Sequence, residues 1–277
     1  MALKSGTAIN LTVFNLPRLS VDIDLDFSEN LPREEMQARR DRISTILERY
    51  MTAEGYRQKG KSKRTFILDS FVYSYTNAAG NADNIKVEIN YALRCHVLPT
   101  VALTALTIEM FEPFPIQTLA PVEIFASKIV AMSSRAAARD LYDLNNMVYY
   151  SLFDEADLIM LRKCVVFYWA IAGDVAASDF GFKRIEGITQ HKIKTDLSPM
   201  IRGTERFDLP AAQKRVSGFL HENIILTEKE TLFIQRFSAG YYEPSLLFEN
   251  NEVLERITTH PMAAWRIRHI REGIQDR

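Results

Sequence analysis

Apolar and polar residues alternate strictly in two stretches of the first third of the chain. In residues 21–27 aliphatic and aromatic residues alternate with three aspartates, and residues 85–91 alternate in the same way with other polar residues. A period of two is typical of a strand with one buried face. Residues 66–75 are rich in aromatic and β-branched side chains, and the turn-forming segment 77–84 joins them to 85–91 as a predicted hairpin. Shorter runs predict two further strands, at residues 100–110 and 116–119.

Helical spacing of apolar residues appears first in residues 32–55 and dominates from Pro121 onward. Strand signals largely end after Ser151. The pattern therefore predicts an α+β fold, with a mixed sheet and flanking helices over residues 1–150 and a C-terminal helical bundle over residues 151–277. The helices expected after residue 120 are 121–134, 137–150, 158–172, 211–221, 228–238 and 251–258.

Bulk composition adds few constraints. The chain has 277 residues and a net charge of −1, so no global positive charge indicates a nucleic-acid partner. Its two cysteines have no metal-ligand spacing, and we expect them to be reduced thiols. Neither a signal peptide nor an apolar run long enough to cross a bilayer is present, so we expect a cytoplasmic protein without a membrane partner.

The aspartates of residues 21–27 are the most unusual feature of the sequence. Asp22, Asp24 and Asp26 project from one face of the predicted strand, and Asp22 and Asp24 lie ~6–7 Å apart along it. Aspartate is depleted in strands, and like charges on one face repel. A divalent cation bound between two carboxylates would offset this repulsion, whereas the alternative is a solvated sheet face. We expect Asp26 to face solvent.

Glu88 extends this pattern to a second strand. If the two strands are neighbours, Glu88 faces the same site as Asp22 and Asp24. Carboxylates from adjacent strands are typical Mg²⁺ ligands, with water and substrate phosphates completing the coordination. A site with one or two Mg²⁺ ions supports in-line displacement at phosphorus, in which one ion activates the attacking oxygen and the other stabilises the leaving pyrophosphate.

Candidate phosphate contacts lie on either side of these strands. The small residues Ser5, Gly6 and Thr7 form a predicted turn whose backbone amides can approach a phosphate closely. Lys128 and Arg135 are seven residues apart on one helix face, where they either grip a triphosphate or are solvated.

Two further charged groups leave alternatives open. The carboxylates at positions 140 and 143 can cap structure, pair with Arg135 or Arg139, or orient the lysine at position 128, and salt bridging is the simpler interpretation of Asp143. The basic segment 57–64 is either a solvated loop or a contact for RNA phosphates.

Several blocks, in order, resemble the AbiEii/AbiGii toxin type of nucleotidyltransferase in the polymerase-β-like superfamily. The resemblance implies that Asp22, Asp24 and Glu88 hold metal, that Ser5 and Gly6 hold the triphosphate, and that Lys128 and Asp140 complete the nucleotide site. Ser5 stands where the family has a glycine. The blocks are Lys4–Leu11, Arg18–Asp24, Lys86–Ile89, Lys128–Ala131, Arg135 and Arg139–Leu144.

The function implied by this resemblance is Mg²⁺-dependent transfer of a nucleoside monophosphate from an NTP to an acceptor. It also implies the toxin of a type IV toxin–antitoxin system, with tRNA or another RNA as acceptor and a cognate antitoxin as partner. Two alternatives stay open. The acceptor is a small molecule or a protein, or the chain is a catalytically degenerate module that binds nucleotide or RNA.

Overall fold

A computed structural model describes residues 1–60, 62–106, 112–172 and 180–273. In these residues eight strands form a single mixed sheet, in the order β3-β5-β6-β2-β1-β8-β7, with β4 paired to β5. The pairs β2–β6 and β1–β8 are parallel and the others are antiparallel. The strands are β1 (Ala2–Leu3), β2 (Ile23–Asp26), β3 (Arg57–Gln58), β4 (Lys63–Arg64), β5 (Leu68–Thr76), β6 (Ala82–Asn90), β7 (Val101–Thr104) and β8 (Pro115–Thr118).

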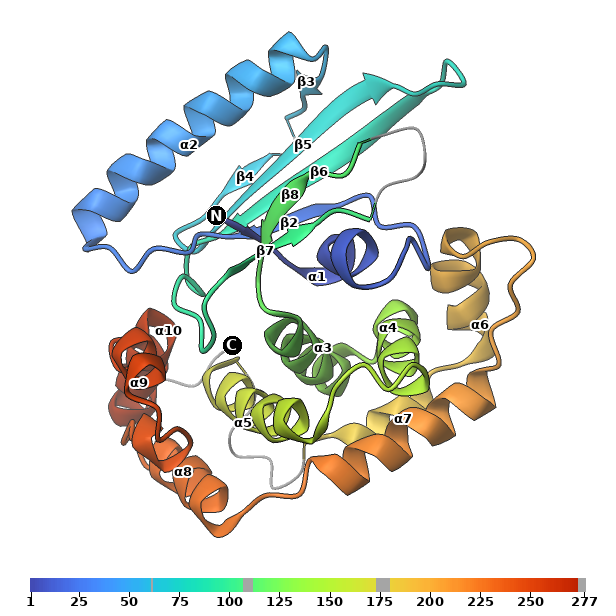
Figure 1. The fold of residues 1–277 in the computed structure, drawn as a ribbon. Coiled ribbons are helices and arrows are strands. Elements are labelled where there is room, and N and C mark those ends of the chain that lie inside the picture. Colours follow the sequence, from blue (N-terminus) through green and yellow to red (C-terminus); the bar gives the residue numbers. More distant parts are fainter. Residues whose placement is uncertain (61, 107–111, 173–179, 274–277) are drawn as a thin grey trace.

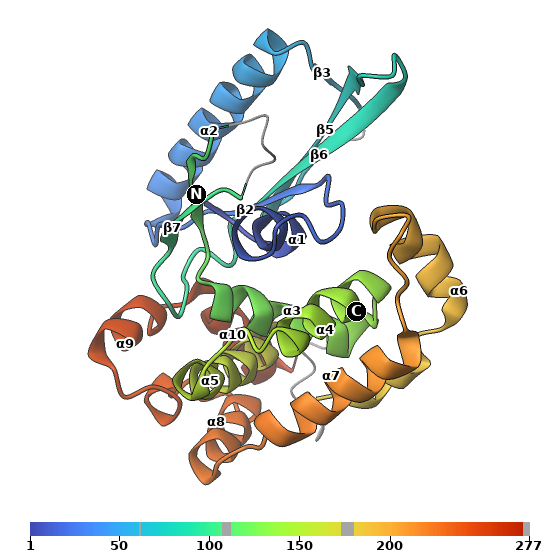
Figure 2. The ribbon, with the colours of Figure 1, turned by 45° about the vertical axis from the view of Figure 1, so that its right-hand side comes forward.

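The helices flank this sheet unevenly. One long helix, α2, covers one face, while α1 and the helical body lie on the other side (Figure 1, Figure 2). The helices are α1 (Ser5–Ala8), α2 (Arg33–Ala53), α3 (Pro121–Arg135), α4 (Ala138–Tyr149), α5 (Glu155–Ala172), α6 (Gln190–Lys192), α7 (Leu209–Asn223), α8 (Glu228–Ser238), α9 (Asn251–Ile257) and α10 (Pro261–Glu272). A π-helical turn, η1 (Ile9–Val13), continues α1.

The alternating pattern of residues 21–27 divides the two faces of the sheet as expected. Phe27 packs with Met36 of α2 and with Ile89 and Tyr91, so the apolar residues of β2 face α2. A buried ion pair between Arg40 of α2 and an aspartate of β5 also ties the helix to this face. The acidic residues of β2 consequently face α1 and the helical body.

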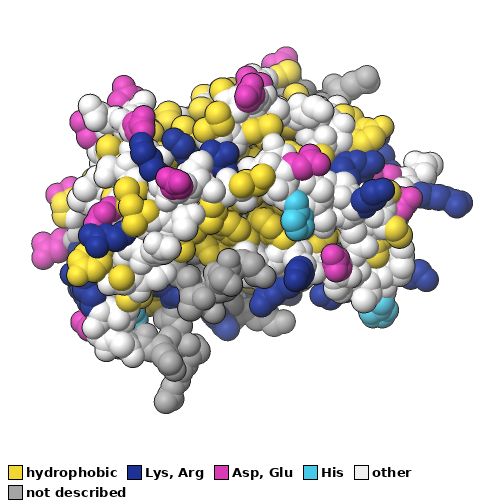
Figure 3. All heavy atoms as spheres, turned by 90° about the horizontal axis from the view of Figure 1, so that it is seen from below, with side chains coloured by type: hydrophobic (Ala, Val, Ile, Leu, Met, Phe, Trp, Pro, Cys, Tyr) yellow, Lys and Arg dark blue, Asp and Glu magenta, His cyan; other side chains and the backbone are white. Residues whose placement is uncertain are grey.

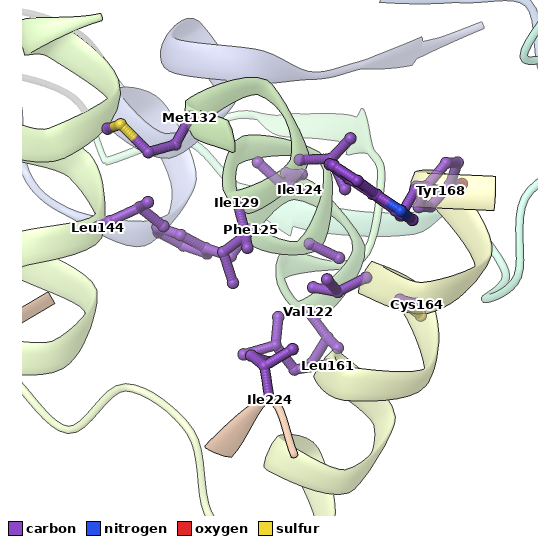
Figure 4. Close-up of a cluster of buried hydrophobic side chains, with 14 of the residues drawn as sticks. Val122, Ile124, Phe125, Ile129, Met132, Leu144, Leu161, Cys164, Tyr168 and Ile224 are labelled. Carbon is purple, nitrogen blue, oxygen red and sulfur yellow. The ribbon is translucent and has the colours of Figure 1, made fainter. Parts of the chain in front are cut away.

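The main hydrophobic core lies in the helical body and reaches back to the sheet. It includes residues from Ala2 to Ile267, so it continues across residue 150. In Figure 4, side chains of α3 such as Phe125 and Ile129 meet Leu144 of α4 and Leu161 of α5. Viewed from below, this body mixes acidic and basic side chains over its surface (Figure 3).

A buried carboxylate anchors α3 to the loop that follows β6. Glu123 accepts hydrogen bonds from the backbone N–H groups of Val97 (2.8 Å) and Leu98 (3.1 Å), and from the hydroxyl of Tyr168. Burial raises the pKa of Glu123 to about 7, although these hydrogen bonds act in the opposite direction.

The predicted elements agree closely with the observed ones. The α+β class is confirmed, and the strand and helix expected at residues 21–27 and 32–55 correspond to β2 and α2. Part of the strand expected at residues 100–110 lies outside the described residues. The turn expected at Ser5 is instead the beginning of α1, and α10 was not expected. In the described part of the chain, no helix is long and apolar enough to span a membrane.

Candidate active site

Strands β2 and β6 bring the three predicted metal ligands to one face of the sheet. The strands are parallel, and their register places Asp24 directly opposite Glu88. Asp22 immediately precedes β2 and lies two residues from Asp24, so it shares the same face. The prediction that the two strands are neighbours is confirmed.

An ammonium group lies between two of these carboxylates. The Nζ atom of Lys86 is 3.1 Å from Oε2 of Glu88 and 3.8 Å from Oδ2 of Asp22. Partial burial opposes the charge of Lys86, but its hydrogen bond with Glu88 and the charge of Asp22 raise the pKa of this ammonium. Burial raises the pKa of Asp24, and the negative charges of Glu88 and Asp22 raise it further. The positive charge of Lys4 acts to lower this pKa.

The third aspartate of residues 21–27 does not face solvent, contrary to the expectation. Asp26 is buried, with 1% of its surface exposed, and its carboxylate lies 2.5 Å from the ammonium of Lys4. Burial raises its pKa to about 6, while the Lys4 charge acts to lower it. The alternation correctly placed Asp26 on the acidic face of the sheet. Asp26 is nevertheless buried, because α1 and α3 cover the end of that face where it lies.

The donor set fits a hard divalent cation in its chemistry. Asp22, Asp24 and Glu88 offer carboxylate oxygens on one face, and the Lys86 ammonium marks where positive charge is already stabilised among them. No three acidic, histidine or cysteine side chains of the described residues converge closely enough to hold a metal ion.

The segment before β2 is built on a close approach between Gly6 and Arg18. A Cβ atom on Gly6 would lie 2.4 Å from Nη2 of Arg18, so a larger residue cannot occupy this position without displacing the guanidinium. Ser5 has a φ of +60°, a left-handed conformation that is uncommon for serine. The Thr7 hydroxyl donates a hydrogen bond to the backbone carbonyl of Asp22, which fixes the acidic segment to α1.

A buried charge network connects this segment to α3 and α4. Arg18 donates two hydrogen bonds of 2.7 Å to Asp143. Lys128 is buried, and its ammonium lies 2.9 Å from Asp140 and 2.5 Å from Asp143. Arg135 donates to the other oxygen of Asp140 at 2.7 Å, while 63% of its side chain stays exposed. Asp140 therefore forms ion pairs with both Lys128 and Arg135, the two cations that the sequence pattern placed on one helix face.

This network bears on two of the alternatives that the sequence left open, those for Lys128 and Asp143. A solvated Lys128 is wrong, because two carboxylates enclose its ammonium. Burial opposes that charge, but Asp143 and Asp140 raise the pKa of Lys128. Burial acts to raise the pKa of Asp140, yet Lys128 and Arg135 lower it below its usual value. Salt bridging by Asp143 is confirmed, with Arg18 and Lys128 as its partners.

A cavity of about 100 Å³ lies where the first segment meets α3. Its walls combine charged groups from both sides with apolar side chains of the core. The polar residues that line it are Lys4, Ser5, Asp26, Ser127, Lys128, Arg135, Asp140 and Tyr168. Asp24 adjoins this group through Lys4, whose backbone N–H donates to the Asp24 carbonyl at 2.9 Å. The fold thus gathers residues from positions 4 to 140 around one acidic sheet face.

Comparison with known proteins agrees with this arrangement. Residues 1–229 match the family described as nucleotidyl transferase AbiEii toxin of type IV toxin–antitoxin systems. The chain belongs to the AbiEii family of nucleotidyltransferase toxins. No curated protein matches the chain.

Among solved structures, the chain is similar to MenT4, a nucleotidyltransferase toxin from Mycobacterium tuberculosis H37Rv. The TM-score is 0.60 at 19% sequence identity, over 94% of this chain and 84% of MenT4. At this identity the likeness shows a common fold, while the match to the AbiEii family gives the class of enzyme.

Sequence reasoning assigned no role to three residues that shape the site. Lys4, Arg18 and Lys86 lie within blocks that resemble the family, but their partners are distant in the chain or on another strand. For Asp143, salt bridging was the simpler interpretation, with capping and the orientation of Lys128 as the alternatives. The basic segment 57–64 contains β3 and β4. Arg64 pairs with Asp41, and Lys61 lies outside the described residues. Its contact with RNA stays a prediction.

Proposed function

We propose that this AbiEii-family toxin transfers a nucleoside monophosphate from an NTP to an RNA acceptor, with tRNA as the leading candidate. The observation that carries the proposal is the register of Asp24 against Glu88 on the sheet face that meets Ser5 and Lys128. Three carboxylates and a set of phosphate-binding cations on one face are what phosphoryl chemistry requires.

Each group has a part in the proposed reaction. Asp22, Asp24 and Glu88 hold Mg²⁺, which supplies Lewis-acid stabilisation of the phosphate charge when bound. Ser5, Gly6 and Thr7 approach the triphosphate through their backbone, and the exposed guanidinium of Arg135 contacts its outer oxygens. Asp140 fixes Arg135 and, together with Asp143, holds Lys128 as a buried positive charge beside the nucleotide.

The bonds that change are few. A hydroxyl oxygen of the acceptor attacks the α-phosphorus of the NTP, and a new P–O bond forms. The bond from the α-phosphorus to the bridging oxygen breaks, and that oxygen leaves with pyrophosphate. The hydroxyl proton passes to a carboxylate of the site. As the toxin of a type IV system, the protein also has a cognate antitoxin, which we expect to be encoded by an adjacent gene.

Incubation with each labelled NTP, Mg²⁺ and total RNA tests the proposal. Wild-type protein should label RNA and release pyrophosphate. Asp24→Asn should lower the rate of this reaction at least 100-fold, which is the size of effect seen when one preorganised electrostatic group is removed. Asp83→Asn is the matched control, because Asp83 is an exposed aspartate on β6. Label on a metabolite or on protein would exclude the RNA acceptor alone. NTP affinity in calorimetry without pyrophosphate release would instead identify a degenerate binding module.

A further inference from the structure

A second cavity, of about 390 Å³, is lined by Pro17 and Tyr142, the residues that directly precede Arg18 and Asp143 in the chain. Three segments form its walls: residues 13–17, which end η1 and follow it, residues 142–150 of α4 and its C-terminal end, and the loop 202–205. Its size falls within the range of about 300–1,000 Å³ that small-molecule pockets span. None of the residues that line the first cavity lines this one.

Aromatic rings supply two of its walls. Phe14 and Tyr150 lie with their ring centroids 5.6 Å apart, and Phe14 is fixed from behind by an edge contact with Phe125 of the core. Tyr150 is 63% exposed, so its ring is not required to fill the core. The Tyr142 hydroxyl lies 2.8 Å from both the Pro17 carbonyl and the Glu205 carboxylate, and this holds the cavity walls together.

Polar groups of matching chemistry surround these rings. The side-chain amides of Asn15 and Asn146 line the cavity, and each amide both donates and accepts hydrogen bonds. Arg202 brings a positive charge to the lining. A second guanidinium, that of Arg215, lies 5.1 Å from the ring centroid of the neighbouring Tyr149. Aromatic faces, amide edges and arginines are the combination by which proteins bind unpaired bases and their phosphates.

We infer that this cavity binds an unpaired nucleobase of the RNA acceptor, next to the nucleotide that receives the transferred group. The inference rests on the proposed RNA acceptor. Pro17 and Tyr142 line the cavity and directly precede Arg18 and Asp143, so the cavity lies close to the buried ion pair that also holds Lys128. An RNA strand that passes this ion pair would present one base to Tyr150 and the adjoining nucleotide to the acidic face.

Tyr150→Ala tests the inference, with Tyr50→Ala as its matched control. Tyr50 lies near the end of α2 and is 61% exposed, so both variants remove an exposed ring from near a helix end. Thermal melts check that both keep the fold. Anisotropy of a labelled single-stranded RNA, measured without NTP, should show a Kd raised about 5- to 100-fold by Tyr150→Ala alone, the range expected for losing one stacked base.

An RNA carrying one abasic nucleotide locates the contact. Scanned along the strand, the abasic site should weaken wild-type binding at one position, and Tyr150→Ala should remove that position's effect. In transfer assays the variant should raise KM for RNA and leave KM for NTP unchanged. Equal RNA affinity of Tyr150→Ala and Tyr50→Ala would overturn the inference, even where both label RNA. If no RNA is labelled, the proposed function fails, while the anisotropy comparison still decides whether this cavity binds a base.

Discussion

Arg18 and Asp143, 125 residues apart in the chain, form a buried ion pair with two parallel hydrogen bonds of 2.7 Å. The pair joins the segment before β2 to α4, and its carboxylate also contacts Lys128. A planar guanidinium matches a carboxylate in this forked geometry better than lysine does. The position of Lys128 relative to the acidic face of the sheet therefore depends on Arg18, which is not one of the residues of that face.

Replacing Arg18 by alanine should lower both stability and nucleotidyl transfer. Loss of one partner leaves a buried carboxylate short of its counter-charge, and we expect the free energy of unfolding to fall by about 3 kcal/mol. Arg40→Ala is a close control. Arg40 forms a similar buried forked pair with Asp69, on the α2 face of the sheet, and Asp69 also retains a second cation, Arg64.

Denaturant unfolding and NTP titration separate the two effects. Both variants should be destabilised to a similar extent, whereas only Arg18→Ala should weaken NTP binding. If the alanine variants do not fold, Arg18→Lys and Arg40→Lys provide the same comparison. Equal NTP affinity of the two variants would show that Arg18 acts on stability alone.

Gly6→Ala should displace the guanidinium of Arg18 and reduce transfer activity at least tenfold. The added Cβ would lie 2.4 Å from Nη2 of Arg18 and 2.9 Å from the Ser20 hydroxyl. Gly218→Ala is the control, because Gly218 lies within α7 with nothing within 4 Å of the added atom. That variant should gain about 0.5–1 kcal/mol of stability, since alanine is the better helix former. Thermal melts and rate measurements on the same preparations check both expectations.

Lys86→Gln should increase the response of the protein to Mg²⁺. The ammonium now lies between Asp22 and Glu88, and its removal leaves two carboxylates without their counter-charge. In the presence of a chelator the variant should lose up to about 1 kcal/mol, because the pair is partly exposed. Added Mg²⁺ should then raise its Tm more than that of the wild type. Lys229→Gln, which breaks an exposed pair with Glu249, should leave the Mg²⁺ response unchanged. An equal Mg²⁺ response in Lys86→Gln and wild type would count against metal binding at these carboxylates.

Stability should fall as the pH rises from about 4.5 to about 7, through the titration of Glu123. Its pKa is raised to about 7 in the folded protein, from 4.5, so the folded state holds a proton that the unfolded state releases. Stabilisation is complete below pH 4.5 and is lost as the pH passes 7, by on the order of 3 kcal/mol. Unfolding of wild type and Glu123→Gln at pH 5 and pH 8 measures this contribution, because glutamine does not titrate. A constant difference between the two proteins across this pH range would refute the assignment.

The local pattern predicted the sheet at the site well. Alternation in residues 21–27 and 85–91 gives both the strands and the faces on which Asp24 and Glu88 lie. Pairing between β2 and β6 was a conditional expectation, and the parallel register confirms it. Residues with the strongest local signal were therefore placed correctly.

Long-range partners could not be predicted in the same way. Periodicity puts Asp26 on the acidic face but does not reveal that Lys4 and α3 cover it. The spacing of Lys128 and Arg135 indicates a common face, yet the enclosure of Lys128 depends on α4 packing beside it. These contacts depend on chain segments that approach each other only in the folded protein. The roles of the site residues in catalysis stay predictions that the variants above can test.

The core that continues from Ala2 to Ile267 has a consequence for regulation by proteolysis. The helices that carry Lys128 and Asp140 pack against α5 and α7, so part of the candidate active site is supported from the second half of the chain. A fragment ending at residue 150 would expose those apolar helix surfaces to water and could not keep the two charged groups in place. We therefore expect one cut in the connection after α4, followed by loss of the C-terminal fragment, to inactivate the toxin without touching any residue of the acidic face.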